Sequence, residues 1–323
     1  RRNMLRHVEF TLGTVTVDGK EYPLLDTSFP TVDPADPNRL TEDEEKIITQ
    51  LRNTFVNNEK MRRHMGCLLR DGSLYLARNN NLMFHASMPL NEDASFKDVE
   101  VEGEHFSGKA LFDRLDRLVQ LACSSSNDEG DRSYAVDYMW YLWCGPDSPL
   151  FDKSKMATFE RYLIADKETH REVRGNYYQL HDSEEVCDSI LREFGLPTEG
   201  AHIINGHVPV KIRKGENPVK AGGKLLVIDG GFSRAYQPET GIAGYTLVYH
   251  SRGFQLVEHE PFESREKAIE EGQDIISNTV LNEFKAKRMK VRDTDKGREL
   301  VEQVTDLNKL LAAYRRGLVK EEE

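Results

Sequence analysis

The stretch AHIINGHVPVKIRKGENPVKAGGKLLVIDGG, residues 201–231, decides how the fold is interpreted. Its first apolar run, His202–Ile204, predicts a buried strand that an Asn-Gly pair ends just before His207. A second apolar run, Lys224–Ile228, predicts a strand that ends at Asp229-Gly230-Gly231. Side chains at strand ends can reach a cleft while the sheet anchors the backbone. The pattern therefore predicts a site centred on His207.

A second histidine repeats this pattern earlier in the chain. The apolar run Leu82–Phe84 predicts a short strand that leads directly into His85. A lone histidine after a strand is more often a hydrogen-bonded loop residue than a metal ligand. Spacing alone therefore leaves both interpretations open for His85 and His207.

Composition limits the class of protein. The 323 residues are 38% hydrophobic and 31% charged, which is typical of a soluble globular protein with one large domain or two smaller ones. The net charge of −11 argues against nonspecific binding to nucleic acid or anionic membranes. The chain has no apolar run of membrane-spanning length, no signal-peptide core and no CxxC pair. We therefore expect a cytoplasmic protein with reduced thiols.

Local patterns predict several further elements. Residues 9–26 predict a β-hairpin that turns at Asp18-Gly19. A capping box that begins at Thr41 predicts a helix as far as about Arg63. Residues 280–318 predict a heavily charged helical segment, with leucines at helical spacing, that packs on a partner or on the body of the protein.

Two groups of basic residues are candidates for holding an anion. Arg161 lies among apolar neighbours, so it needs an anionic partner, either a protein carboxylate or a substrate phosphate. Lys211 and Arg213 alternate on an apparent strand after His207, which would point both side chains to one face.

Longer segments resemble a known family. NGHVPV at 205–210, GKLLVIDGGFS at 223–233, TGIAGYTLVYHS at 240–251 and YMWYLWCGPDSPLF at 138–151 are similar to class III, or Firmicutes-type, fructose-1,6-bisphosphatases. These are calcineurin-like metallophosphoesterases, and the resemblance covers nearly the whole chain, matching the family's C-terminal half. It implies an α/β fold in which two sheets form a sandwich flanked by helices, with metals at the strand ends.

The resemblance also implies a chemistry. Fructose 1,6-bisphosphate would be hydrolysed at its 1-phosphate to fructose 6-phosphate, in gluconeogenesis, by a dinuclear site that we expect to hold Mn²⁺. His85 and His207 match the family's two late histidine positions, so both would bind the same ion. Neutral imidazoles suit Zn, Mn or Fe. The candidates for holding substrate phosphate lie in or near the matching segments: Lys155, Arg161, Lys211, Arg213 and Arg234.

The sequence departs from the family's pattern in one respect. Residues 1–323 contain no GDxHG, GDxxDRG or GNHE motif, and the chain does not begin with methionine. We therefore expect an N-terminal half of the same protein to supply the remaining metal ligands and the main catalytic groups, and these residues alone to show little phosphatase activity. The implied segments are 1–70, continuing upstream; 71–262, the C-terminal half of the catalytic domain; and a helical 263–323.

Two other interpretations remain open. A related Ser/Thr protein phosphatase would share the two histidines but prefer an open surface groove. A non-catalytic regulatory half would explain the absent motifs and the charged C-terminal segment. The expected partners are a sugar bisphosphate, the N-terminal half and, as an open question, a second copy of the chain; nucleic acid and membrane are not expected.

Overall fold

The computed structural model describes residues 2–124, 129–272 and 276–319. The chain divides into two compact units, one made of residues 1–74 and 87–179 and the other of residues 75–86 and 180–323. Both units contain helices and strands, so the predicted mixed α/β class is confirmed. The units differ from the three segments predicted from the sequence, because residues 75–86 pair with strands that lie more than 100 residues later.

The first unit contains two small antiparallel sheets and most of the helices. One sheet, β1-β2-β3, turns at Asp18-Gly19, where both residues have positive φ, so the predicted hairpin is confirmed. Its elements are β1 (Val8–Glu9), β2 (Thr14–Val17), β3 (Lys20–Pro23), α1 (Glu42–Val56), α2 (Glu59–Asp71), β6 (Val99–Val101), β7 (Glu104–Phe106), α3 (Gly108–Ala122), α4 (Glu129–Cys144), α5 (Thr158–Leu163) and α6 (Tyr177–Leu180).

The helix predicted from Thr41 to about Arg63 is two helices. Thr41 begins α1 with the predicted capping box. The helix ends at Val56, and the side chain of Asn58 accepts a hydrogen bond from the backbone N–H of Met61 at 3.0 Å, which begins α2. Asparagine side chains compete with helical backbone bonds, so the Asn57-Asn58 pair interrupts the predicted helix.

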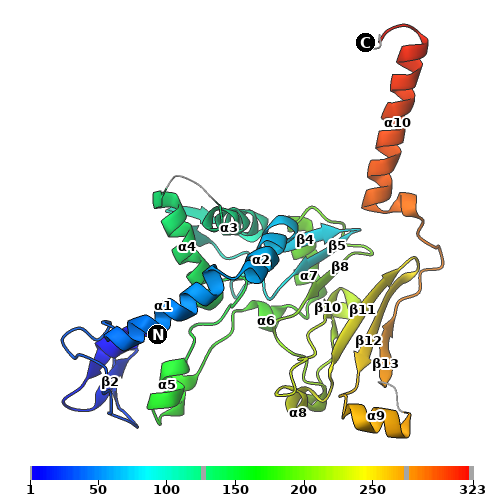
Figure 1. The fold of residues 1–323 in the computed structure, drawn as a ribbon. Coiled ribbons are helices and arrows are strands. Elements are labelled where there is room, and N and C mark those ends of the chain that lie inside the picture. The colour runs from blue at the N-terminus through cyan, green and yellow to red at the C-terminus, as the bar shows by residue number, and fades with distance from the viewer. Residues whose placement is uncertain (1, 125–128, 273–275, 320–323) are drawn as a thin grey trace. The chain divides into compact units, whose positions relative to one another are not determined.

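The second unit is built around a five-stranded sheet in the order β4-β5-β8-β10-β9 (Figure 1). Its three inner strands, β5, β8 and β10, are parallel, and the outer two are antiparallel to their neighbours. The remaining elements of this unit are a second sheet and four helices. The bounds are β4 (Tyr75–Arg78), β5 (Asn81–Phe84), α7 (Glu184–Glu193), β8 (His202–Asn205), β9 (Val219–Lys220), β10 (Leu225–Val227), α8 (Gln237–Thr240), β11 (Gly244–His250), β12 (Gly253–His259), α9 (Arg265–Glu271), β13 (Ser277–Asn282) and α10 (Asp295–Arg315).

The two sheets of this unit share a hydrophobic core. Ile204 and Leu226 of the five-stranded sheet pack with Phe254 of β12, and Leu247 and Leu281 extend the cluster. Because β8 and β10 are buried almost throughout, they show the continuous apolar runs of inner parallel strands. This packing fixes the ends of the inner strands, where the predicted site lies.

The helical segment predicted at 280–318 begins too early. Residues Ser277–Asn282 form β13, which pairs with β12, and the helix α10 starts only at Asp295. The predicted segment includes the end of β13, where the β-branched residues Thr279 and Val280 favour a strand and pairing with β12 supplies backbone hydrogen-bond partners. Within the described residues no helix is both long enough and apolar enough to span a bilayer.

Candidate metal-binding site

Parallel pairing brings the predicted histidines to one edge of the five-stranded sheet. The strands β5 and β8 lie side by side in parallel, and His85 and His207 follow their carboxyl ends. The ring nitrogens His85 Nε2 and His207 Nδ1 are 3.1 Å apart, and the ring centroids are 4.9 Å apart. The structure therefore brings together two residues that are 122 positions apart in the sequence.

Backbone hydrogen bonds hold both histidines in place. The N–H of Gly206 donates to the carbonyl of His85 at 2.9 Å, and the side-chain amide of Asn205 donates to the carbonyl of Ala86 at 3.1 Å. Asn205 is buried. The two strand ends are thus tied to each other directly beside the imidazoles.

His207 occupies a strained backbone position. Its φ is +67°, and the N–H of Val208 donates to the carbonyl of Gly206 at 2.8 Å, which is the hydrogen bond of a γ-turn centred on His207. A side chain other than glycine costs about 1–3 kcal/mol in such a conformation. Strain of this kind occurs frequently at functional sites, and here it turns the imidazole toward His85.

A carboxylate follows the third inner strand at the same edge of the sheet. Asp229 follows β10, the third inner strand; its carbonyl accepts from the N–H of Val210 at 2.8 Å, and its Oδ1 accepts from the N–H of Gly231 at 2.9 Å. Burial lowers the pKa of His85, and the negative charge of Asp229 opposes that shift in part. His85 is therefore neutral at neutral pH, with a lone pair available on one nitrogen.

The histidine pair fits one divalent ion. Two nitrogens bound to the same ion at about 2.1 Å, at octahedral or tetrahedral angles, lie about 3.0–3.4 Å apart. The observed 3.1 Å falls in that range, and it also suits a hydrogen bond between two neutral imidazoles. No cluster of three His, Cys, Asp or Glu side chains within the described residues could enclose a metal ion. The described residues therefore offer a partial ligand set.

The predicted phosphate-binding cations do not form one group. Lys211, Arg213 and Arg234 belong to the unit that carries the histidines, whereas Lys155 and Arg161 belong to the other unit. Most are engaged with protein oxygens. The nearest polar partners are Asp18 for Lys155 at 3.1 Å, Glu172 for Arg161 at 3.3 Å, Glu239 for Lys211 at 3.5 Å and the carbonyl of Pro238 for Arg213 at 2.8 Å. Arg234 is exposed in the loop before α8.

The structure decides two of the sequence predictions about these cations, of which the first is wrong. Lys211 and Arg213 do not alternate on a strand, because Val210 turns back to pair with Asp229 and Ile212–Lys214 forms a 3-10 turn. Arg161 has the carboxylate partner that the sequence left open, Glu172. Whether any of these side chains holds a substrate phosphate stays a prediction.

The sequence analysis missed a buried carboxylate in the first unit. Asp152 is only 3% exposed, and the buried side chain of Ser87 lies beside its carboxylate. Burial raises the pKa of Asp152 to about 6. A Cβ on Gly175 would lie 2.0 Å from Asp152 Oδ1, so glycine at 175 makes room for this carboxylate. Asp152 lies within a segment with many polar residues, and no sequence signal distinguished it from its exposed neighbours.

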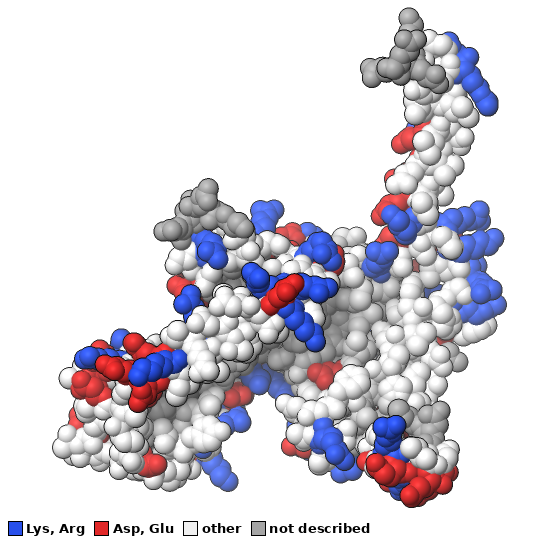
Figure 2. All heavy atoms as spheres, viewed as in Figure 1, with Lys and Arg blue, Asp and Glu red and all other residues white. Residues whose placement is uncertain are grey.

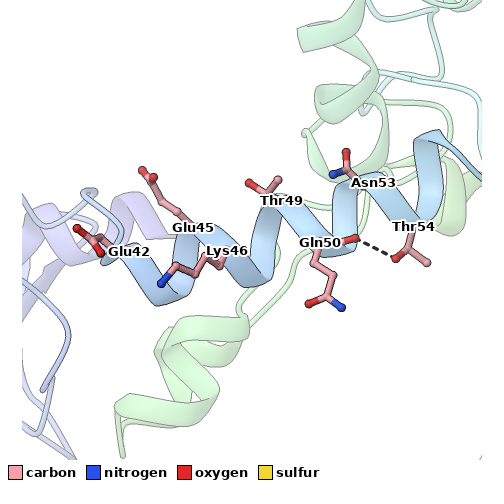
Figure 3. Close-up of a pocket in the computed structure, with 7 residues that line it drawn as sticks. All are labelled: Glu42, Glu45, Lys46, Thr49, Gln50, Asn53 and Thr54. Carbon is pink, nitrogen blue, oxygen red and sulfur yellow. Dashed lines mark hydrogen bonds between the residues drawn. The ribbon is translucent and has the colours of Figure 1, made fainter.

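A hollow of about 750 Å³ lies along α1, and its lining includes none of the residues predicted to act (Figure 3). Figure 3 shows a row of polar side chains on one face of the helix, with Thr54 donating to the carbonyl of Gln50 at 2.9 Å. The lining residues are Glu42, Glu45, Lys46, Thr49, Gln50, Asn53 and Thr54. With two carboxylates and one amine, this hollow is not suited to a doubly phosphorylated sugar.

Comparison with known proteins assigns the chain to a family. A sequence model of the Firmicute fructose-1,6-bisphosphatase family matches residues 1–316. The chain belongs to this family. It is 61% identical over 320 residues to a protein of Bacteroides fragilis, 58% over 320 residues to one of Bacteroides thetaiotaomicron and 54% over 318 residues to one of Clostridium tetani. All three are named fructose-1,6-bisphosphatase class 3.

These relatives are longer than the chain. Each alignment covers 98–99% of the chain and 48% of the relative, so the chain spans about half the length of the curated relatives it matches. No solved structure matched the chain.

Proposed function

We propose that this chain takes part in the metal-dependent hydrolysis of fructose 1,6-bisphosphate to fructose 6-phosphate. The proposal is made for a protein of its relatives' length, in which these residues supply His85 and His207 as ligands of one divalent ion. The observation that carries it is the 3.1 Å pairing of His85 Nε2 with His207 Nδ1 at adjacent parallel strand ends, in a chain of this family.

The finer features predicted from the resemblance are part of this proposal. They are a calcineurin-like metallophosphoesterase sandwich, a dinuclear manganese site, and ligands contributed from outside residues 1–323. The shared core of the two sheets in the second unit is compatible with the sandwich. Gluconeogenesis and a cytoplasmic location remain predictions from the sequence.

The chain's own residues would have separate tasks. A divalent ion bound there supplies Lewis-acid activation of water and neutralises charge on the phosphoryl oxygens. His85 presents a neutral ring nitrogen because burial lowers its pKa, and the γ-turn directs His207 to the same point. Asp229 adds a negative charge beside the pair, which favours a cation there.

The remaining substrate phosphate needs a cation that can exchange its present partner. Lys211 lies in the same unit as the histidines, and its 3.5 Å contact with partly exposed Glu239 is weak. A phosphate dianion would compete well for this ammonium group. Lys211 is therefore our first choice among the five candidate cations, and KM for the bisphosphate should rise when it is replaced by methionine.

The test uses a protein of the relatives' length that contains these residues, assayed for phosphate release with Mn²⁺. His85→Ala and His207→Ala should each lower kcat by about 100-fold or more, since removing even an outer-shell partner of a metal ligand costs 10–100-fold. His105→Ala is the matched control, because His105 is an exposed histidine paired with Asp98. Activity within twofold of wild type in both site variants would contradict the proposal.

A second arm separates the alternative interpretations. The 323-residue chain is assayed alone and after mixing with the half of the Bacteroides fragilis relative that it does not match. Little activity alone and restored activity in the mixture supports a shared site. Activity on a phosphopeptide in preference to the sugar bisphosphate would support the Ser/Thr phosphatase interpretation. A mixture that binds the divalent ion but hydrolyses neither substrate would support a regulatory role.

A further inference from the structure

Asn205 is a buried polar residue at the end of the inner strand β8, directly before Gly206 and His207. Figure 2 shows Lys, Arg, Asp and Glu side chains on the surface of the molecule, where water solvates them. Asn205 is only 5% exposed, and the residues before it in β8, Ile203 and Ile204, are apolar. A buried amide costs free energy unless it forms hydrogen bonds, so its contacts indicate what the residue does.

Asn205 connects β8 to both of its neighbouring strands. On the β10 side, its backbone carbonyl accepts from the N–H of Ile228 at 2.9 Å, continuing the parallel pairing in which Val227 lies opposite Asn205. On the β5 side, its side-chain amide donates to the carbonyl of Ala86 at 3.1 Å. The backbone thus contacts one neighbour, and the side chain contacts the segment that leaves the other.

The carbonyl of Ala86 is accessible to this amide because the chain bends at residues 85 and 86. In a regular strand consecutive carbonyls point to opposite sides, so only every second one faces a given neighbour. Here the consecutive carbonyls of His85 and Ala86 both accept from the end of β8. The first accepts from the backbone N–H of Gly206 at 2.9 Å, and the second accepts from the Asn205 amide. The Asn205 side chain therefore supplies a donor that a regular ladder does not offer.

These two hydrogen bonds restrict where both imidazoles point. The direction of a side chain follows from the backbone on either side of its Cα. Holding the carbonyls of His85 and Ala86 fixes the two peptide units that follow the Cα of His85. Gly206 makes one of these bonds and directly precedes His207, so the same contacts hold the second histidine. Movement of either segment would change the 3.1 Å separation of the ring nitrogens.

We propose that Asn205 is a positioning residue that holds the imidazoles of His85 and His207 at the separation that one divalent ion requires. It acts through the backbone of both histidines, not as a ligand. The inference rests on the proposed function for the role of the two imidazoles, but their pairing is a property of the chain without metal. Leucine is similar in size to asparagine and lacks the donor, so Asn205→Leu should allow the segment after β5 to move.

Asn81 provides a matched control at the opposite end of the same sheet. It is 4% exposed, and its side-chain amide donates to the carbonyls of Arg78 and Asn79 at 3.2 and 3.0 Å. It begins β5, opposite His202 at the beginning of β8, whereas the paired histidines follow the carboxyl ends of these strands. Asn81→Leu should therefore destabilise the fold for the same reason as Asn205→Leu, without separating the imidazoles.

One measurement needs no metal. In the 323-residue chain with isotopically labelled histidine nitrogens, a hydrogen bond between two imidazoles gives an NMR scalar coupling across the bond. We expect this coupling between His85 Nε2 and His207 Nδ1 in the wild type and in Asn81→Leu, and its loss in Asn205→Leu. Coupling that persists in folded Asn205→Leu would overturn the proposal, and so would its absence from the wild type or its loss in both variants.

Titration of the same three proteins with Co²⁺ measures the consequence for metal binding. Asn205→Leu should weaken Co²⁺ binding by about 10–100-fold, the usual cost of removing a group that orients a metal ligand, and Asn81→Leu should leave it within about twofold. Equal affinities of the wild type and Asn205→Leu would overturn the proposal. If the wild type binds no Co²⁺ while the coupling is lost in Asn205→Leu alone, the proposed metal site fails and the positioning role of Asn205 is supported.

A second pair of variants covers the case in which leucine prevents folding. Asn205→Ala and Asn81→Ala remove the same donors and leave space in place of an apolar side chain. Far-ultraviolet circular dichroism establishes that each variant is folded, and denaturant unfolding compares their stabilities. A positioning role predicts a similar loss of stability in both and loss of the imidazole coupling in Asn205→Ala alone. The same coupling in both variants would overturn it.

Discussion

The strand-end edge of the second unit and the loops at 147–178 of the first unit position polar side chains by different means. At the edge, His85, His207 and Asp229 follow three adjacent parallel strands, and backbone hydrogen bonds tie the strand ends together. In the segment 147–178, Lys155 in a loop and Arg161 in α5 pair with carboxylates, and Asp152 is buried. The comparison teaches that sheet topology can bring residues distant in the sequence to within a hydrogen-bond distance. Outside the sheet, the position of a polar side chain depends instead on the individual contacts that it makes with its neighbours.

The largest change in the free energy of unfolding should come from a substitution that disturbs the close backbone packing at the strand-end edge. A Cβ on Gly230, just after β10, would lie 2.5 Å from the backbone Cα of Gly244. Gly230→Ala should therefore lower the free energy of unfolding by about 3 kcal/mol or more, because backbone cannot move aside as a side chain can. Gly66→Ala is the matched control: Gly66 lies within α2, nothing lies within 4 Å of its added Cβ, and the change should stabilise the helix by about 0.5–1 kcal/mol. Denaturant unfolding measures both, and equal effects would contradict the packing argument.

The buried carboxylate in the loops should give the next largest effect. Burial raises the pKa of Asp152 to about 6, above its ordinary value of 3.8, so the folded state prefers the protonated form. The charged form therefore destabilises the fold above pH 6, and this penalty disappears as the pH falls from 6 to below 4. Asp152→Asn should raise the free energy of unfolding at pH 8 by about 2–3 kcal/mol, with a smaller gain near pH 4.5.

Urea unfolding at both pH values checks this prediction. Asp18→Asn is the control, because Asp18 is a highly exposed aspartate whose ion pair with Lys155 is open to solvent. A gain from Asp152→Asn that is the same at pH 4.5 and pH 8 would show that the gain does not come from removing the charge. A loss at pH 8 would show that the carboxylate has a partner that stabilises its charge, and either result would contradict the prediction.

The strained turn at His207 should have an effect of intermediate size. Because φ at this residue is +67°, glycine fits the backbone better than any other residue. His207→Gly should therefore be about 1 kcal/mol more stable than His207→Ala, although both lack the imidazole. Thermal unfolding of the two variants measures the difference, and equal stability would argue against the γ-turn.

The sequence predicted the strand-end edge but not the loops, for physical reasons. Short apolar runs at Leu82–Phe84 and His202–Ile204 predict buried strands, and parallel strands necessarily end at the same edge of a sheet. Lys211 and Arg213 were misplaced on a strand because the turn at His207 and the bond from Val210 to Asp229 depend on tertiary packing. The burial of Asp152 likewise depends on segments distant in the sequence, since glycine at 175 provides the space that it occupies.

The smallest effect on stability is expected for the ion pair between Arg161 of α5 and Glu172. Arg161 contacts Glu172 at 3.3 Å, but its side chain is 55% exposed. Arg161→Ala should therefore lower the free energy of unfolding by less than about 1 kcal/mol. If the same variant raises KM for fructose 1,6-bisphosphate more than tenfold in a protein of the relatives' length, Arg161 contacts substrate; an unchanged KM assigns it to structure alone.

The shared ion is tested most directly by titrating the 323-residue chain with Co²⁺ while the imidazole resonances of His85 and His207 are followed by NMR. Imidazole nitrogens bind Co²⁺ more tightly than Mn²⁺, so two such ligands should suffice to detect binding. We predict that both resonances broaden together at the same Co²⁺ concentration, and that His85→Ala or His207→Ala abolishes the broadening of the remaining histidine. Broadening of one histidine that persists after the other is removed would contradict a shared ion.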